Sequence, residues 1–421
     1  MTESGLTVGA PPEAPRAATR FRLTWRVGLL ALLAFLLLLS FVRVVSDAND
    51  LTSSGAIGAA LAAAVPIAMA GLGGLWSERA GVVNIGLEGM MILGTWFGAY
   101  AAFNWGPWYG VLFGALGGVL GGLLHAIATV TFGVDHIVSG VAINILALGW
   151  TRYLSSLTFA KYKGGGDTQS PPLPTIGQVS LPGMDDPLSD LERKHWFFLS
   201  DLAGLLRGLT VNVSQLIVVA ALLVVLSYFV LWRTAFGLRL RSCGENPVAA
   251  ETLGVNVYFY KYAAVLVSGG LAGVGGAFLA IVSGNLYREG QTGGRGFIGL
   301  AAMIFGNWRP GGMAAGAGIF GYTDALQLRS GDKSIHALLL LIALLLFAFA
   351  AWQFSRRGRR WATVVAILGG VTLATYLISD TVPGEFTSAA PHITTLLVLS
   401  LAAQRLRMPK ADGLPYRRGG G

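Results

Sequence analysis

Residues 107–131 read PWYGVLFGALGGVLGGLLHAIATVT and contain no Asp, Glu, Lys or Arg. A run of about 20 apolar residues is long enough to cross the hydrocarbon core of a bilayer as an α-helix, which satisfies its own backbone hydrogen bonds. Gly110, Gly114, Gly118 and Gly122 recur at every fourth position of this run. One face of the predicted helix therefore has no side chains, and a neighbouring helix can approach it closely.

The composition is that of an integral membrane protein. Of the 421 residues, 54% are hydrophobic and 12% are charged, whereas soluble domains have about 25% charged residues. The net charge of +9 does not indicate nucleic acid, because the basic residues stand in short clusters between apolar runs, as membrane orientation requires. The single cysteine, Cys243, excludes disulfide frameworks and iron–sulfur clusters, and the five histidines lack ligand spacing, so we expect no metal and no cofactor.

Ten apolar runs are predicted to span the membrane. They are residues 27–45, 55–76, 83–103, 107–131, 137–159, 211–232, 259–282, 335–352, 361–378 and 389–403. A further stretch, 297–328, is interrupted by Asn307-Trp308-Arg309-Pro310-Gly311-Gly312, which predicts two half-helices that fold back. The sequence thus predicts an all-α polytopic membrane protein, a bundle of about ten transmembrane helices with a re-entrant or broken segment.

The positions of Lys and Arg predict the orientation. With the N-terminus inside, the inner segments hold 18 of the 30 basic residues and both ends of the chain are cytoplasmic. We therefore expect a cytoplasmic tail over residues 1–26, a transmembrane domain over 27–404 and a second cytoplasmic tail over 405–421. Within the domain, 160–210 form a long extracytoplasmic loop, either a docking surface or a solvated linker, and 233–258 form a cytoplasmic loop.

Two of the 21 acidic residues, Glu88 and Asp324, lie well within apolar runs. An ionisable side chain at that depth normally faces a cavity or a partner. Asn84 and Glu88 are four positions apart and share one face of the predicted third helix, which Gly81 and Gly86 weaken. Transporters line mid-membrane sites with such broken helices. A satisfied Glu88 with a structural role is the equally weighted alternative.

Asn144 and Asn307 place further amide side chains in two separate segments. Neutral donors and acceptors suit a small hydroxylated or heterocyclic solute better than an ion. For Asp324, a structural bond to Gln327 one helical turn away is the favoured interpretation.

The segment 233–255, RTAFGLRLRSCGENPVAAETLGV, lies between two predicted spans. Asn246 is placed to cap a short helix with Pro247 at its first position, and Gly254 is placed to end it. Ala249, Ala250 and Leu253 then lie close together on this helix. Such a small-residue ridge with flanking charges suits a cleft on a soluble partner, and an ordinary connecting loop is the alternative.

Several of these stretches together resemble a known family. They are the two around Asn84 and Asn246, residues 134–144 (VDHIVSGVAIN), 306–312 (GNWRPGG) and 413–417 (GLPYR). In this order they resemble the permease subunits of bacterial ABC importers for nucleosides and simple sugars. The resemblance covers about 55–334 and resumes from 391 to the end. Residues 335–378 depart from the family pattern and predict an extra helix pair.

The resemblance implies a subunit of the bacterial cell membrane that pairs with a second homologous permease, binds a cytoplasmic ABC ATPase and receives solute from an extracytoplasmic substrate-binding lipoprotein. It implies that the inner helix couples to the ATPase and that polar residues line the path of a small polar solute. The coupling residues are Gly244, Glu245, Asn246, Pro247, Ala249, Ala250, Leu253 and Gly254. The path residues are Asn84, Glu88, Asn144 and Asn307.

The chain contains no GxxxxGK[ST] motif, so we do not expect an enzyme, and ATP hydrolysis is assigned to a separate subunit. The predicted mechanism is alternating access driven by that ATPase. Three alternatives stay open: a branched-chain amino-acid ABC permease, a proton-coupled secondary transporter that uses Glu88 or Asp324, and a non-transporting membrane scaffold. A proton-coupled carrier would lose uptake with the proton gradient, and a scaffold would show no uptake.

Overall fold

The structure, a computed structural model, describes residues 25–355, 359–379, 382, 406–417 and 419. The predicted last span, 389–403, and most of the N-terminal tail lie outside the described residues. The described part is mostly helical with almost no sheet, which confirms the predicted class. Its short strands, β1 (Gln178–Val179) and β2 (Val213–Ser214), pair antiparallel in the long loop.

The helices follow the apolar runs of the sequence. In chain order they are α1 (Trp25–Ser46), α2 (Ser54–Arg79), α3 (Leu87–Trp105), α4 (Pro107–Ala126), α5 (His136–Thr158), α6 (Asp185–Arg193), α7 (Leu199–Thr210), α8 (Gln215–Arg233), α9 (Ala235–Glu245), α10 (Pro247–Thr252), α11 (Val257–Phe278), α12 (Arg295–Phe305), α13 (Pro310–Ser355) and α14 (Arg359–Ile378). Single π-helical turns extend α4 and α11, and a short 3₁₀ helix, Asn49–Thr52, precedes α2.

Seven segments of the described residues are long and apolar enough to cross a membrane. They are Ser54–Arg79, Pro107–Thr131, His136–Thr158, Gln215–Arg233, Val257–Ser283, Lys333–Ser355 and Arg359–Ile378. Each corresponds to one of the predicted runs. The predicted span 83–103 starts later, at Leu87, because residues 80–86 leave the helix.

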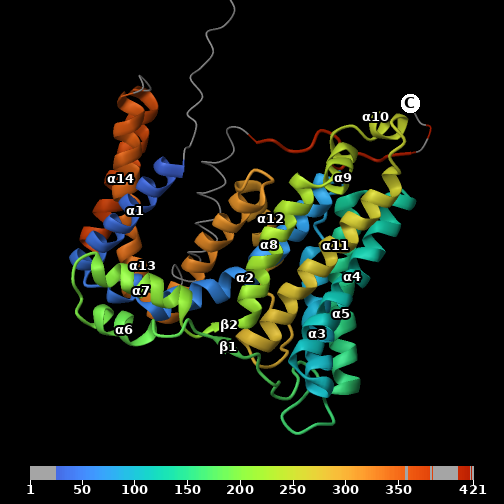
Figure 1. Cartoon of the computed structure of the whole chain (residues 1–421), viewed down its shortest axis with the longest axis horizontal. Helices are drawn as coiled ribbons and strands as arrows, with labels where there is room; N and C mark the ends of the chain where they lie inside the picture. The colour runs from blue at the N-terminus through green and yellow to red at the C-terminus, as the bar shows by residue number, and fades with distance from the viewer. Residues whose placement is uncertain (1–24, 356–358, 380–381, 383–405, 418, 420–421) are drawn as a thin grey trace, which may run out of the picture.

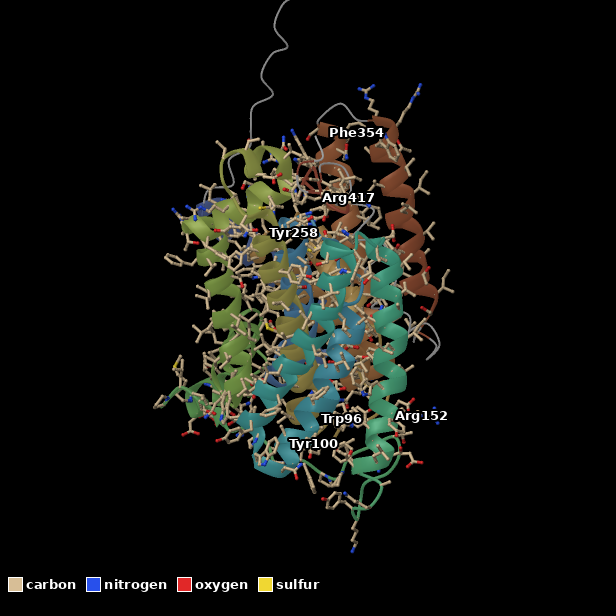
Figure 2. The ribbon with its side chains drawn as sticks, turned by 90° about the vertical axis from the view of Figure 1, so that its right-hand side faces the viewer. Trp96, Tyr100, Arg152, Tyr258, Phe354 and Arg417 are labelled. Carbon is tan, nitrogen blue, oxygen red and sulfur yellow. The ribbon has the colours of Figure 1, made fainter. Side chains whose placement is uncertain are left out.

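The bundle has two groups of helices joined by α2 (Figure 1). The helices α3, α4, α5 and α11 lie together on one side, α1 and α14 lie on the other, and α2 runs between them. Tyr258 and Arg417 lie at one end of the bundle and Tyr100 and Arg152 at the opposite end (Figure 2). We call these the α10 end and the α6 end, after the helices found there.

Closely packed glycines join α3, α4 and α11. A Cβ atom added to Gly118 would lie 2.0 Å from the carbonyl oxygen of Gly269, and one added to Gly273 would lie 2.2 Å from that of Gly114. A Cβ on Gly94 of α3 would lie 2.4 Å from the carbonyl oxygen of Gly273. The glycine repeat predicted to allow close approach therefore brings three backbones into direct contact.

Only one of the two half-helices predicted for residues 297–328 is found in the structure. Helix α12 is as short as expected, but α13 continues from Pro310 to Ser355, about 69 Å if it were straight. It is not straight. Pro310 follows Trp308 at the α10 end, the guanidinium of Arg329 lies against Gly55 at the start of α2, and Phe354 is again at the α10 end (Figure 2). α13 therefore crosses the bundle and returns. Its length is about twice what one span needs.

Residues 185–210 of the predicted long loop fold onto the bundle rather than forming a solvated linker. Helix α7 packs against α2, and Arg43 of α1 pairs with Asp201 of α7 at 2.7 Å, with both side chains buried. The hydroxyl of Thr52 also donates to Asp201. Residues 211–214, predicted to begin a span, instead complete this layer, and α8 begins at Gln215.

Candidate functional site

Two groups of predicted residues occupy separate places in the structure. The predicted coupling segment forms α9, α10 and the following turn at the α10 end (Figure 1). Asn246 caps α10, since its Oδ1 accepts a 3.0 Å hydrogen bond from the backbone N–H of Ala249, and Pro247 is the first residue of the helix. Gly254 follows with φ of +81°, a conformation that favours glycine. The predicted start and stop signals are therefore confirmed.

The small-residue ridge expected on α10 is divided between two faces. Ala249 is exposed and Leu253 is 85% exposed, whereas Ala250 is only 3% exposed and packs in the main apolar core. Val248 is 43% exposed on the outer side. Because Ala250 is buried against the core, it anchors α10 on the bundle. Val248, Ala249 and Leu253 are exposed and remain free for a partner. The expectation that Ala250 shares an exposed ridge with Ala249 and Leu253 is wrong.

Gly244 joins the coupling segment to α2. A Cβ atom on Gly244 would lie 2.3 Å from the carbonyl oxygen of Arg79, at the last residue of α2. The adjacent Cys243 is fully buried, and burial raises the pKa of its thiol to about 11. The coupling segment is therefore in backbone contact with a spanning helix, and its cysteine is an unreactive thiol.

The second group surrounds the linker between α2 and α3, residues 80–86, which we call the α2–α3 linker. Gly81 takes a φ of +81°, and the chain leaves the helix there. Asn84 is therefore outside any helix, whereas Glu88 is in the first turn of α3, so the prediction that they share one helical face is wrong. Asn84 is fully buried; it donates to Ser268 Oγ of α11 at 2.9 Å and accepts from the N–H of Gly86 at 3.1 Å.

Asn144 of α5 binds the same linker from the other side. Its Oδ1 accepts a 2.7 Å hydrogen bond from the N–H of Gly89, and its Nδ2 donates to the carbonyl oxygen of Ile85 at 3.1 Å. An added Cβ on Gly89 would lie 2.9 Å from Asn144. The structure therefore brings Asn84 and Asn144, which the sequence placed in separate segments, to one break between helices, and both amides bind backbone groups there.

Glu88 binds the start of α12. Its Oε1 accepts from the N–H of Gly294 at 2.9 Å and its Oε2 accepts from the N–H of Gly296 at 2.7 Å. A carboxylate is well suited to this position, because the first amides of a helix have no partners within the helix and carry partial positive charge. Next to it, Arg295 pairs with Asp324 of α13 at 2.8 Å, in place of the predicted bond between Asp324 and Gln327.

Two histidines that the sequence left without a role hold the α2–α3 linker as well. The backbone N–H of Val83 donates to Nδ1 of His136 at 3.1 Å, and its carbonyl oxygen lies 2.9 Å from Nε2 of His125. Ser139 Oγ lies 2.9 Å from Nδ1 of His125. Both backbone polar groups of Val83 are thus held by imidazoles, directly before Asn84. His125 and His136 are eleven positions apart in the sequence, and no spacing rule joins them.

Asn307 does not belong to this group. It lies in the turn between α12 and α13, and its Oδ1 accepts a 2.7 Å hydrogen bond from the backbone N–H of Arg407. The neighbouring Trp308 donates from Nε1 to Glu78 at 2.6 Å and accepts from the guanidinium of Arg79 at 2.7 Å. The α12–α13 turn is therefore bound to the end of α2 and to the C-terminal segment.

Comparison with known proteins decides the family. Residues 56–350 match the model of the branched-chain amino acid transport system permease component. The chain belongs to this permease family. No solved structure matches this permease significantly.

Named relatives cover nearly the whole permease. It is 34% identical to the guanosine ABC transporter permease protein NupQ of Bacillus subtilis, over 86% of this chain and 96% of the relative. It is 35% identical to the nucleoside ABC transporter permease protein NupC of Lactococcus lactis, over 83% of this chain and 93% of the relative. The putative glucose ABC transporter permease protein TsgC13 of Haloferax volcanii is 34% identical over 87% of this chain and 98% of its own. The protein is therefore a multi-pass membrane permease of the ABC transporter class.

Proposed function

We propose that this permease is the membrane subunit of an ATP-driven importer that moves nucleosides into the cell. The observation that carries this proposal is the near full-length similarity to permeases named for guanosine and nucleosides. A simple sugar is the second candidate, because a relative named for glucose is about as similar. Branched-chain amino acids, which the family description names, have less support from these relatives.

The α9–α10 segment is proposed to dock on a separate cytoplasmic ATPase. Three features support this role: Leu253, Val248 and Ala249 form an uncovered outer face, Ala250 anchors the helix, and Gly244 joins it to α2. The sequence has no phosphate-binding loop of its own. By this assignment the α10 end is cytoplasmic, and so are both ends of the chain. The α6 end then faces outward, toward a substrate-binding lipoprotein, and a second permease completes the complex.

The solute path is proposed to pass the α2–α3 linker, with Asn84, Asn144 and Glu88 holding its walls. A helix break at depth is tolerated only where protein groups bind the freed backbone. Asn84 and Asn144 do so at the α2–α3 break, and Glu88 does so at the start of α12. Asn307, at the α10 end, is left out of this path. Transport follows alternating access, in which the ATPase binds two conformations of the permease with unequal affinity and so shifts their populations.

The proton-coupled alternative has little support from Glu88, which is buried, or from Asp324, which is partly exposed. Glu88 accepts two backbone hydrogen bonds and Asp324 is paired with Arg295. A proton carrier needs a carboxylate that changes its partners during transport, whereas these two hold structural positions.

The test is uptake by the permease reconstituted in lipid vesicles with its ATPase, companion permease and substrate-binding lipoprotein. We expect guanosine to enter only when ATP is supplied on the α10 side, with little effect of a proton ionophore. Glucose and leucine are the comparison solutes; preferential ATP-driven uptake of either one would replace the nucleoside assignment. Uptake that persists without ATP would overturn the importer class.

A coupling variant makes the docking assignment separately testable. Leu253→Asp places a charge on the outer face of α10, and we expect it to abolish ATPase recruitment without changing the thermal stability of the permease. Val179→Asp, on the exposed strand β1 at the α6 end, is the matched control. Equal recruitment by the two variants would refute docking through α10.

A further inference from the structure

The C-terminal segment 406–417, which we call the strap, crosses the α10 end. It contacts five segments of the bundle: the α12–α13 turn, the end of α9, the α2–α3 linker, α10 and the start of α11. It lies near Tyr258 at the α10 end in Figure 2, where Arg417 is labelled. The backbone N–H of Arg407 donates to Asn307 in the α12–α13 turn, and that of Ala411 donates to the carbonyl oxygen of Gly244 at 2.8 Å, at the end of α9. The strap therefore joins segments that are far apart in the sequence.

The middle of the strap lies on the α2–α3 linker. A Cβ added to Gly81 would lie 3.1 Å from the carbonyl oxygen of Ala411, and one added to Gly413 would lie 3.4 Å from Val83. Val83 directly precedes Asn84 and is the residue that His125 and His136 hold. The strap thus reaches the segment that carries the polar residues of the proposed path.

The end of the strap binds α10 through Tyr416. The hydroxyl of Tyr416 donates to Oε2 of Glu251 at 2.6 Å, a hydrogen bond to a carboxylate. Its ring lies 5.6 Å from the ring of Tyr258 at the start of α11, and the ammonium of Lys261 lies 5.8 Å from its centroid. Pro415 and the buried Pro409 fix the backbone φ angle at two positions of the strap.

We propose that the strap transmits the displacement of α10 to the α2–α3 linker, with Tyr416 as the positioning residue that fixes the strap to the coupling helix. This inference rests on the proposed ATP-driven import. It adds a route for the movement. A displacement of Glu251 moves Tyr416 and residues 411–413, and these in turn move Val83 and Asn84. The alternative is that the strap only covers the α10 end and stabilises it.

The test measures solute uptake and ATP hydrolysis together in the reconstituted complex. Tyr416→Phe removes the hydroxyl and keeps the ring, so we expect normal ATPase recruitment and hydrolysis but about tenfold fewer solute molecules imported per ATP, the effect of one lost hydrogen bond to a charged group. Tyr153→Phe, on the exposed part of α5 at the α6 end, is the control and should keep the wild-type ratio.

A double-mutant cycle assigns the effect to the contact with α10. Glu251→Leu should lower uptake per ATP as Tyr416→Phe does, and the combined variant should be no worse than either single variant, because both remove the same hydrogen bond. Additive losses, or an unchanged ratio in Tyr416→Phe, would overturn the proposal even if the wild-type complex imports solute. A wild-type complex without ATP-dependent uptake would instead overturn the proposed function, and this inference with it.

Discussion

The carboxylate of Glu88 in α3 accepts a 2.7 Å hydrogen bond from the backbone N–H of Gly296 in α12, 208 positions later in the chain. With the second bond, from Gly294, both oxygens of one side chain bind the first turn of α12. Gly296 permits this close approach of α12 to α3, because an added Cβ at this position would lie 2.7 Å from the Glu88 backbone. A short helix that begins inside the bundle is thus held at its N-terminus by an anion.

The first prediction follows from these two bonds. Glu88→Gln leaves one acceptor oxygen and turns an NH₂ group toward the other backbone N–H, so we expect a loss of about 1–3 kcal/mol in the stability of the detergent-solubilised permease. ATP-driven uptake should fall as α12 loses its position. Glu289→Gln, at a partly exposed acid of the loop before α12, is the control and should change neither quantity. Equal behaviour of the two variants would contradict this role of Glu88.

The second prediction concerns the contact between α4 and α11. Gly118→Ala places a methyl group 2.0 Å from the carbonyl oxygen of Gly269. We expect the helices to separate and the permease to lose about 1–3 kcal/mol or more, measured as a lower midpoint of thermal unfolding in detergent. Gly149→Ala in α5, where an added Cβ meets nothing within 4 Å, is the matched control. A similar midpoint for both variants would show that the contact is not tight.

The third prediction concerns the ion pair between Arg43 and Asp201, whose side chains are 4% and 1% exposed. Removing one partner leaves a buried charge, so Arg43→Met and Asp201→Leu should each cost about 3–5 kcal/mol. The double variant should be more stable than either single variant, because no unpaired charge remains. Thermal unfolding of the four proteins gives the cycle. Simple additivity would mean that the two groups do not depend on each other.

The fourth prediction is a pH dependence of strap docking. Burial raises the pKa of Asp412 from an ordinary value of 3.8 to about 7, and both of its carboxylate oxygens are buried. The charged groups that face it are Glu78 and Arg79 of α2 and Lys261 of α11. An acid with a higher pKa in the docked state favours docking at low pH, and this advantage is lost as the pH rises through about 7.

Hydrogen exchange of residues 406–417 provides the measurement. We expect the strap to be better protected at pH 6 than at pH 8 in the wild-type permease, after correction for the intrinsic rate of exchange. Asp412→Asn imitates the protonated acid, so its strap should be equally protected at both values. Lys410→Gln, at an exposed position of the strap, is the control and should keep the wild-type dependence. Protection that rises with pH in the wild type would reverse the assigned sign.

The sequence was sufficient for features that depend on local pattern. Apolar runs located the spanning helices, the glycine repeat predicted the contact of α4, and Asn246 with Pro247 predicted the start of α10. Each of these signals acts within one helix or between neighbouring turns, where periodicity and capping rules apply.

Features that depend on distant partners were missed or misplaced. Asn84 was assigned to a helix because its spacing from Glu88 fits one, yet His125 and His136 hold the preceding residue in an extended linker. The fold of residues 185–214 depends on Arg43 and Thr52, more than 130 positions earlier in the sequence. The contacts of the strap come from five separate segments, so they produce no periodic pattern in the sequence. No local rule connects such positions.

The glycine contacts among α3, α4 and α11 set a limit on how this permease moves. Where backbones touch directly, helix ridges have no clearance to slide, and any shear would force peptide groups into one another. We therefore expect α3, α4 and α11 to keep their mutual arrangement through a transport cycle. Opening and closing are then expected to involve helices outside this group of three.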